Sequence, residues 1–573
     1  MKMRRAFICG LWATSFIVSA ISAATAAPPA AMPANTASAK DDWWKQAVIY
    51  ELYPRSFADS NNDGIGDLKG ITNHLDYLSD LGVDAIWMTP MFPSPQADFG
   101  YDVADYDNVD PQFGTIADAD ALIAKGKGQN VKIILDFVIN HTSDKHAWFQ
   151  QSRSSRTNPY RDFYIWRDGR NGGPPNNWTS LFGGSAWEKD PATGQYYYHF
   201  FYPQQPDLNW RNPKVEKAMF DAAEWWLKRG VYGYRLDAVG TMFERADLKD
   251  NPPAPGTDAF GLPEQNRIYN TEQPEMHVEL QRLRQNVIDR YPGRILIGET
   301  YVSTAPELTR FYGAHNDELQ LPMFLSLIGV KPLTAAELRP RIEAVENNPV
   351  GGWPCFALNN HDQRRVPSRY DLPAGTTGDD MARITAALLL TLRGTPILYY
   401  GEELGMQNND PKRVEDVQDI IGKKGWPKEK GRDGERTPMQ WDASVNAGFN
   451  TGAKPWLPVG PDYATRNVAA ERNNPNSVLN FYRTLIAERR GNPALAGEMA
   501  MVDRANPNVL SYVRSGGGKK VLTVLNFGVT ASDLTLAQLG GGRAGRVIVQ
   551  NRATMSPAGI HLAPLGVLVA EID

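Results

Sequence analysis

Short apolar segments alternate with helical patterns along most of this chain, and this alternation constrains the fold more than any other feature. The segments are followed by polar loops, as in a parallel sheet buried on both faces. Two intervening stretches, 215–229 and 379–392, carry apolar residues at helical spacing. The pattern favours an α/β fold, either a (β/α)8 barrel or a doubly wound sheet. The predicted strands are 47–53, 85–88, 131–138, 233–236, 295–297, 319–324, 355–358 and 395–399, of which 319–324 is the weakest.

Two regions interrupt the alternation, and a third ends it. Residues 141–210 are rich in Gly, Asn, Pro and aromatic residues, which predicts a small inserted domain after the third strand. Residues 407–441 predict a long irregular loop after the eighth strand. Beyond a closing helix at 476–490, alternating strands with Gly turns predict a C-terminal antiparallel β-sandwich at 493–573. The barrel would then comprise residues 43–140 and 211–492.

The N-terminus has the pattern of a secretory signal peptide, residues 1–26. Lys2, Arg4 and Arg5 precede an apolar run at 6–20, and small residues at 24–26 suit cleavage. An uncleaved signal anchor is the alternative, although the run is short for a membrane span of about 20 residues. Residues 27–42 would be a linker. We therefore expect export to the periplasm or the extracellular space, with no membrane attachment after cleavage.

Composition narrows the possible partners. The formal net charge is −5 and there is no basic run, which argues against a nucleic-acid partner. Signal cleavage would remove Cys9 and leave Cys355 as the only thiol; its apolar surroundings predict a buried core residue. The 15 Trp and 23 Tyr suit a sugar-binding cleft, or equally a large aromatic core.

Polar side chains follow four of the predicted strands at the point where each strand ends. Catalytic groups of (β/α)8 barrels stand at these C-terminal ends. One such carboxylate could belong to a structural ion pair, but acids, imidazoles and an Arg at four strand ends favour a catalytic site. The residues are Asp136 with Asn140 and His141, Arg235 with Asp237, Glu299, and Asn359 to Asp362.

Seven motifs give the chain a resemblance to a known family. They are DFVINH, QPDLNW, GYRLDAV, IGET, NNHDQ, GTPILYYGEELG and RTPMQW, in this order. With these motifs, residues 43–573 resemble α-glucosidases of the α-amylase superfamily (glycoside hydrolase family 13), near oligo-1,6-glucosidases and insect-type maltases. The resemblance implies a (β/α)8 TIM barrel and a retaining, exo-acting α-glucosidase that needs no organic cofactor.

The resemblance also implies roles for three carboxylates. Asp237 matches the nucleophile, Glu299 the general acid/base, and Asp362 a third carboxylate that holds sugar hydroxyls. Retaining enzymes place the nucleophile and acid about 5–5.5 Å apart, a separation that neighbouring strand ends can supply. Arg235 and Asp237 lie two residues apart on one strand and so share a face. We expect Arg235 to keep Asp237 ionised, whereas burial should raise the pKa of Glu299.

Further residues match the family's sugar pocket. Asp98 and Tyr101 match the pocket floor. Arg436 matches an Arg that pairs with Asp98 and closes the cleft, with Arg432 as the competing choice. His141 and His361 match residues that hydrogen-bond glucose; metal ligation is the alternative for both, although no zinc-ligand spacing is present.

The loop at 59–67 resembles part of a calcium-binding loop. Asp59, Asn61, Asp63, the Ile65 carbonyl and Asp67 supply oxygen ligands, with Gly at the sixth position. The twelfth position is Gly70 rather than the usual Glu. The resemblance implies one structural Ca²⁺, and a polar turn without metal is the alternative.

Substrate preference is the least determined property. Ala238 follows the proposed nucleophile, where the family has Val for α-1,6 cleavage and smaller or hydroxylated residues for α-1,4 cleavage. We therefore expect maltose-like α-1,4 substrates. The alternatives are a transglucosidase or trehalose synthase-type isomerase, an oligo-1,6-glucosidase, and a transporter-associated ectodomain without activity. The last is disfavoured because all three acids are present. A monomer and a homodimer both remain open.

Overall fold

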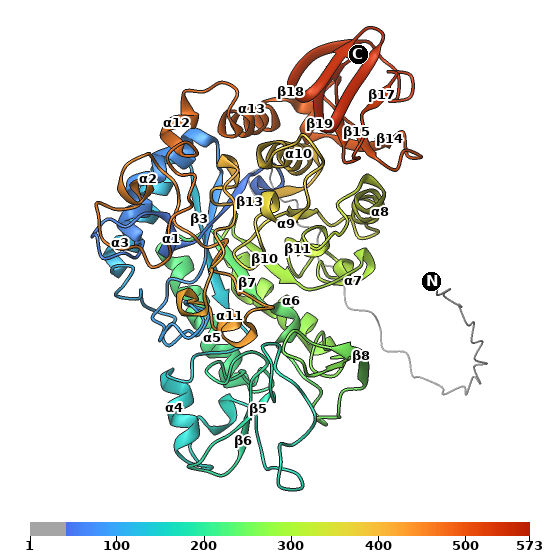
Figure 1. Ribbon diagram of the computed structural model, residues 1–573. Coiled ribbons are helices and arrows are strands. Elements are labelled where there is room, and N and C mark those ends of the chain that lie inside the picture. The colour runs from blue at the N-terminus through green and yellow to red at the C-terminus, as the bar shows by residue number, and fades with distance from the viewer. Residues whose placement is uncertain (1–41) are drawn as a thin grey trace, which may run out of the picture.

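Eight parallel strands close into a barrel in the computed structural model, which describes residues 42–573 (Figure 1). The predicted signal peptide and nearly all of the linker lie outside the described residues. The strands follow the order β1-β2-β3-β7-β10-β11-β12-β13, and β13 pairs with β1. This closure confirms the barrel and excludes the doubly wound sheet. The strands are β1 (Ile49–Leu52), β2 (Ala85–Met88), β3 (Lys132–Val138), β7 (Gly233–Asp237), β10 (Ile295–Thr300), β11 (Leu321–Phe324), β12 (Cys355–Ala357) and β13 (Thr395–Tyr399).

The strands are apolar because the barrel buries both of their faces. One set of side chains, including Ile49, Trp87, Ile297 and Cys355, fills the barrel interior. A larger cluster packs between the sheet and the surrounding helices. The expected burial of Cys355 is confirmed, since its side chain is fully enclosed.

Helices surround the barrel, and capping residues, proline and glycine mark their ends. In α5 (Pro213–Arg229), Asn212 caps the first turn, Pro213 occupies the first position, and Gly230 ends the helix with a φ of 107°. The other long helices are α2 (Leu68–Leu81), α3 (Ile116–Gln129), α6 (Pro274–Asn286), α8 (Ala335–Glu346), α10 (Gly378–Thr391) and α13 (Val478–Gly491). The shorter ones are α1 (Pro54–Phe57), α4 (Ala147–Ser154), α7 (Ala305–Arg310), α9 (Val366–Arg369), α11 (Ile420–Gly425), α12 (Val468–Arg472) and α14 (Pro493–Ala496). None of the helices in residues 42–573 combines the length and apolar character that crossing a membrane requires.

A small insert follows β3. It contains α4 and a three-stranded antiparallel sheet of β4 (Trp166–Arg167), β6 (Tyr196–Tyr198) and β5 (Trp187–Lys189). Trp178, Trp187 and Tyr198 form its aromatic core. A second excursion, after β7, contains the antiparallel pair β8 (Pro253–Thr257) and β9 (Pro263–Gln265). It contacts the insert, since the Trp178 indole donates to the Lys249 carbonyl at 2.9 Å. This pair is not among the elements that the sequence predicts.

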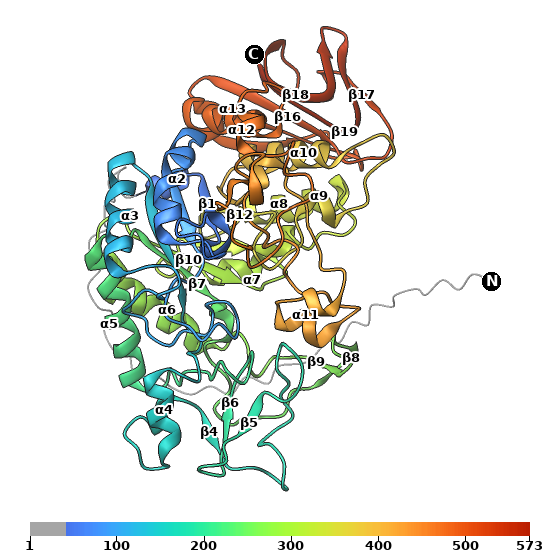
Figure 2. The same cartoon turned by 60° about the vertical axis from the view of Figure 1, so that its left-hand side comes forward.

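An antiparallel β domain ends the chain, as expected. Its strands are β14 (Glu498–Val502), β15 (Val509–Gly516), β16 (Lys519–Asn526), β17 (Ser532–Leu534), β18 (Ala544–Ser556) and β19 (Gly559–Ile572). Arg514 anchors it to the barrel by donating to the Thr391 carbonyl at 2.7 Å. Figures 1 and 2 show this domain at the opposite end of the molecule from the β3 insert.

Candidate active site

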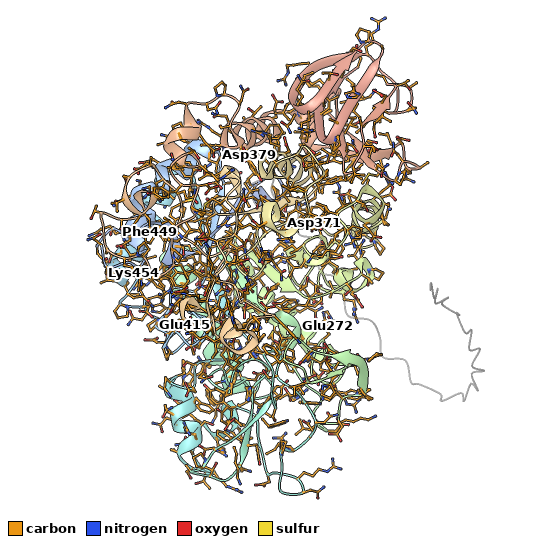
Figure 3. All side chains as sticks on the ribbon, in the orientation of Figure 1. Glu272, Asp371, Asp379, Glu415, Phe449 and Lys454 are labelled. Carbon is orange, nitrogen blue, oxygen red and sulfur yellow. The ribbon has the colours of Figure 1, made fainter. Side chains whose placement is uncertain are left out.

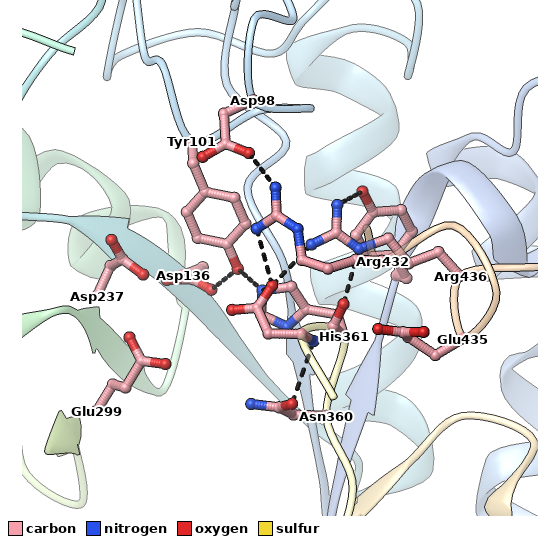
Figure 4. Close-up of polar contacts among 12 residues, drawn as sticks. Asp98, Tyr101, Asp136, Asp237, Glu299, Asn360, His361, Arg432, Glu435 and Arg436 are labelled. Carbon is pink, nitrogen blue, oxygen red and sulfur yellow. Dashed lines mark hydrogen bonds and ion pairs between the residues drawn. The ribbon is translucent and has the colours of Figure 1, made fainter. Parts of the chain in front are cut away.

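Arg235 contacts three carboxylates at the C-terminal end of the barrel. Its Nη1 lies 2.7 Å from Asp237 Oδ1 and 2.9 Å from Asp136 Oδ1, and its Nη2 lies 2.8 Å from Glu299 Oε1. The carboxyl groups of Asp237 and Glu299 therefore contact opposite ends of one guanidinium. Figure 4 shows the two side chains next to each other, on the ends of neighbouring strands. The structure thus brings together the two acids that the sequence predicts.

Local backbone features explain this closeness. At Gly233, with a φ of 134°, an added Cβ would lie 2.0 Å from the Ile295 carbonyl oxygen, so only glycine allows β7 to approach β10. Gly298 is paired with Leu236 in register, which places Glu299 beside Asp237. After Asp237 the chain turns sharply at Ala238, with a φ of 46°. The Ala238 N–H then donates to Glu299 Oε2 at 3.1 Å.

Burial controls the protonation of both acids. It raises the pKa of Glu299 to about 7, although Arg235 acts in the opposite direction. It also raises the pKa of Asp237 to about 7, against the lowering effect of Arg235. Arg235 acts in the expected direction, since it favours the ionised form of Asp237, but loss of hydration has the larger effect on the pKa of Asp237. Arg235 donates a hydrogen bond to Asp237 and also lies 2.8 Å from Glu299 Oε1, so the two acids share one cation and their protonation is linked.

Asp362 lies in a strongly cationic setting. Its Oδ1 is 2.7 Å from Arg436 Nη2 and 3.0 Å from Arg432 Nη1. Burial acts to raise the pKa of Asp362, but His361, Arg432 and Arg436 together outweigh burial and lower the pKa below its usual range. Asp362 is therefore an ionised carboxylate that faces the same cavity as Asp237.

Arg432, not Arg436, pairs with Asp98. The distance from Arg432 Nη2 to Asp98 Oδ1 is 2.6 Å, and Asp419 holds the other side of the guanidinium, with its Oδ2 2.8 Å from Nε. Arg436 instead donates to Asp362 and to the His361 carbonyl. The predicted pairing of Arg436 with Asp98 is thus wrong, and the competing choice is the residue that makes the contact (Figure 4).

The predicted pocket-floor residues share a hydrogen-bonded network. The Tyr101 hydroxyl lies 2.7 Å from His361 Nε2 and 2.9 Å from Asp136 Oδ2. His361 is enclosed, and its Nδ1 lies 2.6 Å from Glu51 Oε1. His141 lines the cavity, with its Nε2 2.9 Å from the Tyr101 carbonyl. No group of three or more His, Cys, Asp or Glu side chains with the geometry of a metal site occurs within residues 42–573, so metal ligation by these histidines gains no support.

Asp98, Tyr101, Asp237, Asp362 and Arg432 line a cavity of about 610 Å³, whereas Arg235, Glu299, His361 and Arg436 are not among its lining residues. Aromatic and polar residues of the insert after β3 also line the cavity, and residues from the loops after β10, β12 and β13 form the rest of its lining. Those further lining residues include His141, Phe182, Phe201, Gln205, Ala238, Tyr301, Gln363, Arg364, Asp410, Lys428 and Glu435. The size is typical of a small-molecule site.

Sequence reasoning missed several residues that shape this cavity. Gln205 donates to Asp98 Oδ2 at 3.2 Å and lies 3.2 Å from His141 Nε2. Gln205 belongs to the QPDLNW motif, so this motif was a sequence signal from which its place in the site could have been predicted. Tyr301, two residues after Glu299, has a side chain that is 55% exposed at the cavity wall. Asp419 lies in the irregular 407–441 loop, where no periodicity marks it.

The predicted calcium loop folds tightly before α2. Asp59 accepts from the Asn62 and Gly64 amides, Asp63 accepts from the Ile65 amide, and Asp67 caps α2. The segment that contains Phe449 and Lys454, both labelled in Figure 3, covers the loop, and the Asp59 amide donates to the Phe449 carbonyl.

The donor set of this loop suits a hard cation. Asp59, Asn61, Asp63, the Ile65 carbonyl and Asp67 all offer oxygen. Asp59 and Asp67 are 7% and 4% exposed; each accepts several hydrogen bonds, including those from the Gly64 and Gly70 amides, and neither has a Lys or Arg partner among the described residues. Buried carboxylates usually have a cationic partner. The chemistry of these donors therefore suits Ca²⁺, but the three Asp side chains are not gathered into the geometry of a metal site.

Comparison with known proteins identifies the family. Residues 51–498 match the model of the α-amylase catalytic domain. A probable α-glucosidase from Rhizobium meliloti is 42% identical over 499 residues, 85% of this chain and 89% of the relative. An oligo-1,6-glucosidase from Parageobacillus thermoglucosidasius is 39% identical over 514 residues, 85% of this chain and 90% of the relative.

Solved structures with the same fold include enzymes that transfer or rearrange glucosyl units. An α-glucosyl transfer enzyme is 41% identical, with a TM-score of 0.84, 93% of this chain covered and 99% of the other. An isomaltulose synthase from Erwinia rhapontici NX5, solved as a variant with sucrose, is 38% identical, with a TM-score of 0.85 and coverage of 93% and 99%. The chain therefore belongs to the α-amylase family of glycoside hydrolases, and within that family it is similar to α-glucosidases.

Proposed function

We propose that the protein is a retaining, exo-acting α-glucosidase that removes terminal α-linked glucose from maltose-like disaccharides and short oligosaccharides. The observation that carries this proposal is the contact of Asp237 and Glu299 with one guanidinium, that of Arg235, at the end of the barrel. Two adjacent carboxyls, one charged and one protonated, are what cleavage through a covalent glycosyl intermediate requires, at a separation of about 5–5.5 Å.

The two acids have different roles in the first chemical step. Asp237 attacks the anomeric carbon, and the C–O bond to the leaving sugar breaks as Glu299 gives its proton to the departing oxygen. The result is a glucosyl ester on Asp237 and an ionised Glu299. In the second step Glu299 takes a proton from water, the water oxygen attacks the anomeric carbon, and the ester bond breaks. Two inversions at one carbon retain the α configuration.

Asp362 supplies a fixed negative charge throughout this sequence. Arg432 and Arg436 keep it ionised beside the ring that develops positive charge. We propose that it binds hydroxyl groups of the glucose and strengthens this hold as the ring distorts. We propose that the Asp98–Arg432 ion pair, whose two residues line the cavity, closes one end of it. A closed end admits only the non-reducing terminus of a chain, which is the basis for exo action.

The preference for α-1,4 linkages is the finer part of the proposal. Ala238 lies on the cavity wall directly after Asp237. Its small side chain leaves room that a Val would fill, and resemblance within the family associates small residues here with α-1,4 cleavage. The related oligo-1,6-glucosidases act, by their names, on the other linkage, so the preference needs direct measurement.

Glucosyl transfer or isomerisation is a second candidate on the same residues. The names of the structurally similar proteins favour it, since they include an α-glucosyl transfer enzyme and an isomaltulose synthase. The exposed Tyr301 ring at the cavity wall offers a surface on which an acceptor sugar could stack. Transfer would differ only in the second step, in which a sugar hydroxyl replaces water.

Two further proposals accompany the activity. The Asp59–Asp67 loop holds one structural Ca²⁺, supported by its oxygen donors and by its two buried carboxylates. The mature protein acts in the periplasm or outside the cell, supported by the N-terminal signal pattern.

The activity test uses 4-nitrophenyl α-glucoside and maltose. Asp237→Asn should abolish turnover of both substrates, because no covalent intermediate can form. Glu299→Gln should abolish turnover of maltose but retain formation of the intermediate from the nitrophenyl substrate, whose leaving group needs no proton. Asp416→Asn is the matched control, since Asp416 is exposed and, among residues 42–573, forms an ion pair with Arg413 alone. By NMR, the first sugar released should be α-glucose; β-glucose as the first product would refute the retaining mechanism.

A further inference from the structure

Glu51 is a buried acid that the proposed mechanism does not use. It lies on β1, inside the barrel wall, and is fully enclosed. Its Oε1 lies 2.6 Å from His361 Nδ1 and accepts from the His361 backbone N–H at 3.1 Å. Its Oε2 has no hydrogen-bond partner within residues 42–573. A charged carboxylate left in this state would be costly.

Three short contacts join Glu51 to the site in series. They are Glu51 to His361 at 2.6 Å, His361 to the Tyr101 hydroxyl at 2.7 Å, and Tyr101 to Asp136 at 2.9 Å. Each contact needs one hydrogen between its two heavy atoms. The Tyr101 hydroxyl supplies one, and a neutral imidazole supplies a second. The third hydrogen must be an additional proton on Glu51, His361 or Asp136.

The hydrogen bonds made by Glu51 and Asp136, at the two ends of this series of contacts, decide where the additional proton resides. Asp136 accepts from Arg235, from the Trp87 indole and from Tyr101, a set of donors that suits a carboxylate. Glu51 accepts one backbone N–H and forms no ion pair with Arg or Lys within the described residues. The environment of Glu51 therefore suits the neutral acid.

The charges around Glu51 agree with this placement. Arg235, Asp136, His361, Asp362 and Tyr399 are the titratable groups that act on it from the neighbouring elements. Burial raises the pKa of Glu51 well above its usual value, and Arg235 only partly offsets this. Burial also lowers the pKa of His361 well below its usual value, which leaves the imidazole neutral.

We propose that Glu51 is a positioning residue: as a protonated carboxylic acid it donates to His361 Nδ1 and fixes His361 in the Nε2–H tautomer. His361 then donates to the Tyr101 oxygen, and the Tyr101 hydroxyl hydrogen is directed to Asp136. Asp136 stays ionised and holds Arg235 against Asp237 and Glu299. Glu51 thus acts on the reacting acids without touching the substrate. This consequence for turnover rests on the proposed function, whereas the protonation state does not.

Infrared spectroscopy tests the protonation state independently of activity. The full-length protein at neutral pH should show a C=O stretching band of a protonated carboxylic acid that disappears in the Glu51→Gln variant. A difference spectrum in which this band does not change would overturn the proposal, because Glu51 would then be ionised. The test needs no substrate, so it decides even if the protein turns over no α-glucoside.

Kinetics test the positioning role. In Glu51→Gln the amide N–H can still donate to Nδ1, so kcat should stay within about 3-fold of the wild-type value. Glu51→Met has a similar length but no donor, and its kcat should fall about tenfold or more, with KM changed less than about 3-fold. Rescue by Gln but not by Met is a result that a merely structural role would not give.

Glu403→Gln is the matched control. Glu403 is equally buried and accepts from the hydroxyls of Tyr50 and Tyr77, but it has no contact with His361. Its kcat and KM should match the wild-type values. Equal loss of kcat in Glu51→Gln and Glu51→Met would overturn the proposal, as would wild-type kcat in both. Melting temperatures of all variants identify any that are misfolded, and the infrared test on Glu51→Gln still decides if Glu51→Met is one of these.

Discussion

Arg432 and Asp98 form a buried ion pair of 2.6 Å that joins the loop after β13 to the loop after β2. The same guanidinium contacts Asp419 and Asp362, so one side chain connects Asp98 to the third carboxylate of the site. Lysine could not replace these contacts, because its ammonium lacks the planar fork of an Arg.

Arg432→Lys should therefore reduce kcat/KM on maltose by about 100-fold or more, mostly through KM, since it leaves buried carboxylates partly unpaired. Arg413→Lys, in the same loop but exposed, is the control and should behave as wild type. Double-mutant cycles decide between the two Arg residues. Asp98→Ala should couple strongly to Arg432→Ala and be nearly additive with Arg436→Ala. Stronger coupling to Arg436 would contradict the pairing seen in the structure.

The pH dependence of turnover should report Glu299. Burial raises its pKa to about 7, and it must be protonated to assist the leaving sugar. We therefore expect kcat/KM on maltose to fall as the pH rises through about 7. In Glu299→Gln, the rate of formation of the intermediate from 4-nitrophenyl α-glucoside should lose this decline. A decline of the same midpoint in the variant would show that a group other than Glu299 causes it, and would contradict this assignment.

Ala238→Val should shift the linkage preference. Added methyl groups beside Asp237 would crowd the leaving sugar, and a change of this size in a pocket is worth roughly 1–3 kcal/mol, or about 10–200-fold. The expected result is a rise in the ratio of kcat/KM for isomaltose to that for maltose. Kinetics on maltose, isomaltose, sucrose and trehalose should be measured for both proteins. If the wild-type protein already prefers isomaltose, the proposed α-1,4 preference is wrong.

Removal of divalent ions should destabilise the fold if the loop before α2 holds Ca²⁺. Chelation by EDTA should lower Tm by about 3–8 °C, and added Ca²⁺ should restore it. Asp63→Ala should make Tm insensitive to both treatments. Asp80→Ala, an exposed change on α2, should retain the wild-type response. An unchanged Tm in the wild-type protein after complete chelation would favour the alternative of a polar turn without metal.

The sequence by itself determined most of the strands and the positions of the acids after them, and its resemblance to a known family implied the barrel. Strands such as β2 and β13 are short apolar runs whose periodicity is local, so their bounds can be read from the chain; the predicted ranges 85–88 and 395–399 coincide with the observed strands. Asp237 and Glu299 follow such runs directly. Because parallel strands end at the same rim, their convergence follows from the order of strands alone.

Only the tertiary structure decided which charged side chains contact each other. Arg432 and Arg436 lie four residues apart in an irregular loop, and no repeating pattern shows which of them faces Asp98. Glu51 lies within an apolar strand, so the sequence did not mark it as a site residue. Its contact with His361 joins residues that are 310 positions apart. The pKa of Asp237 likewise depends on how much water the folded site excludes, which outweighs the neighbouring Arg235. Local periodicity specifies secondary structure, whereas pairing and protonation depend on distances and burial that arise only when the barrel closes.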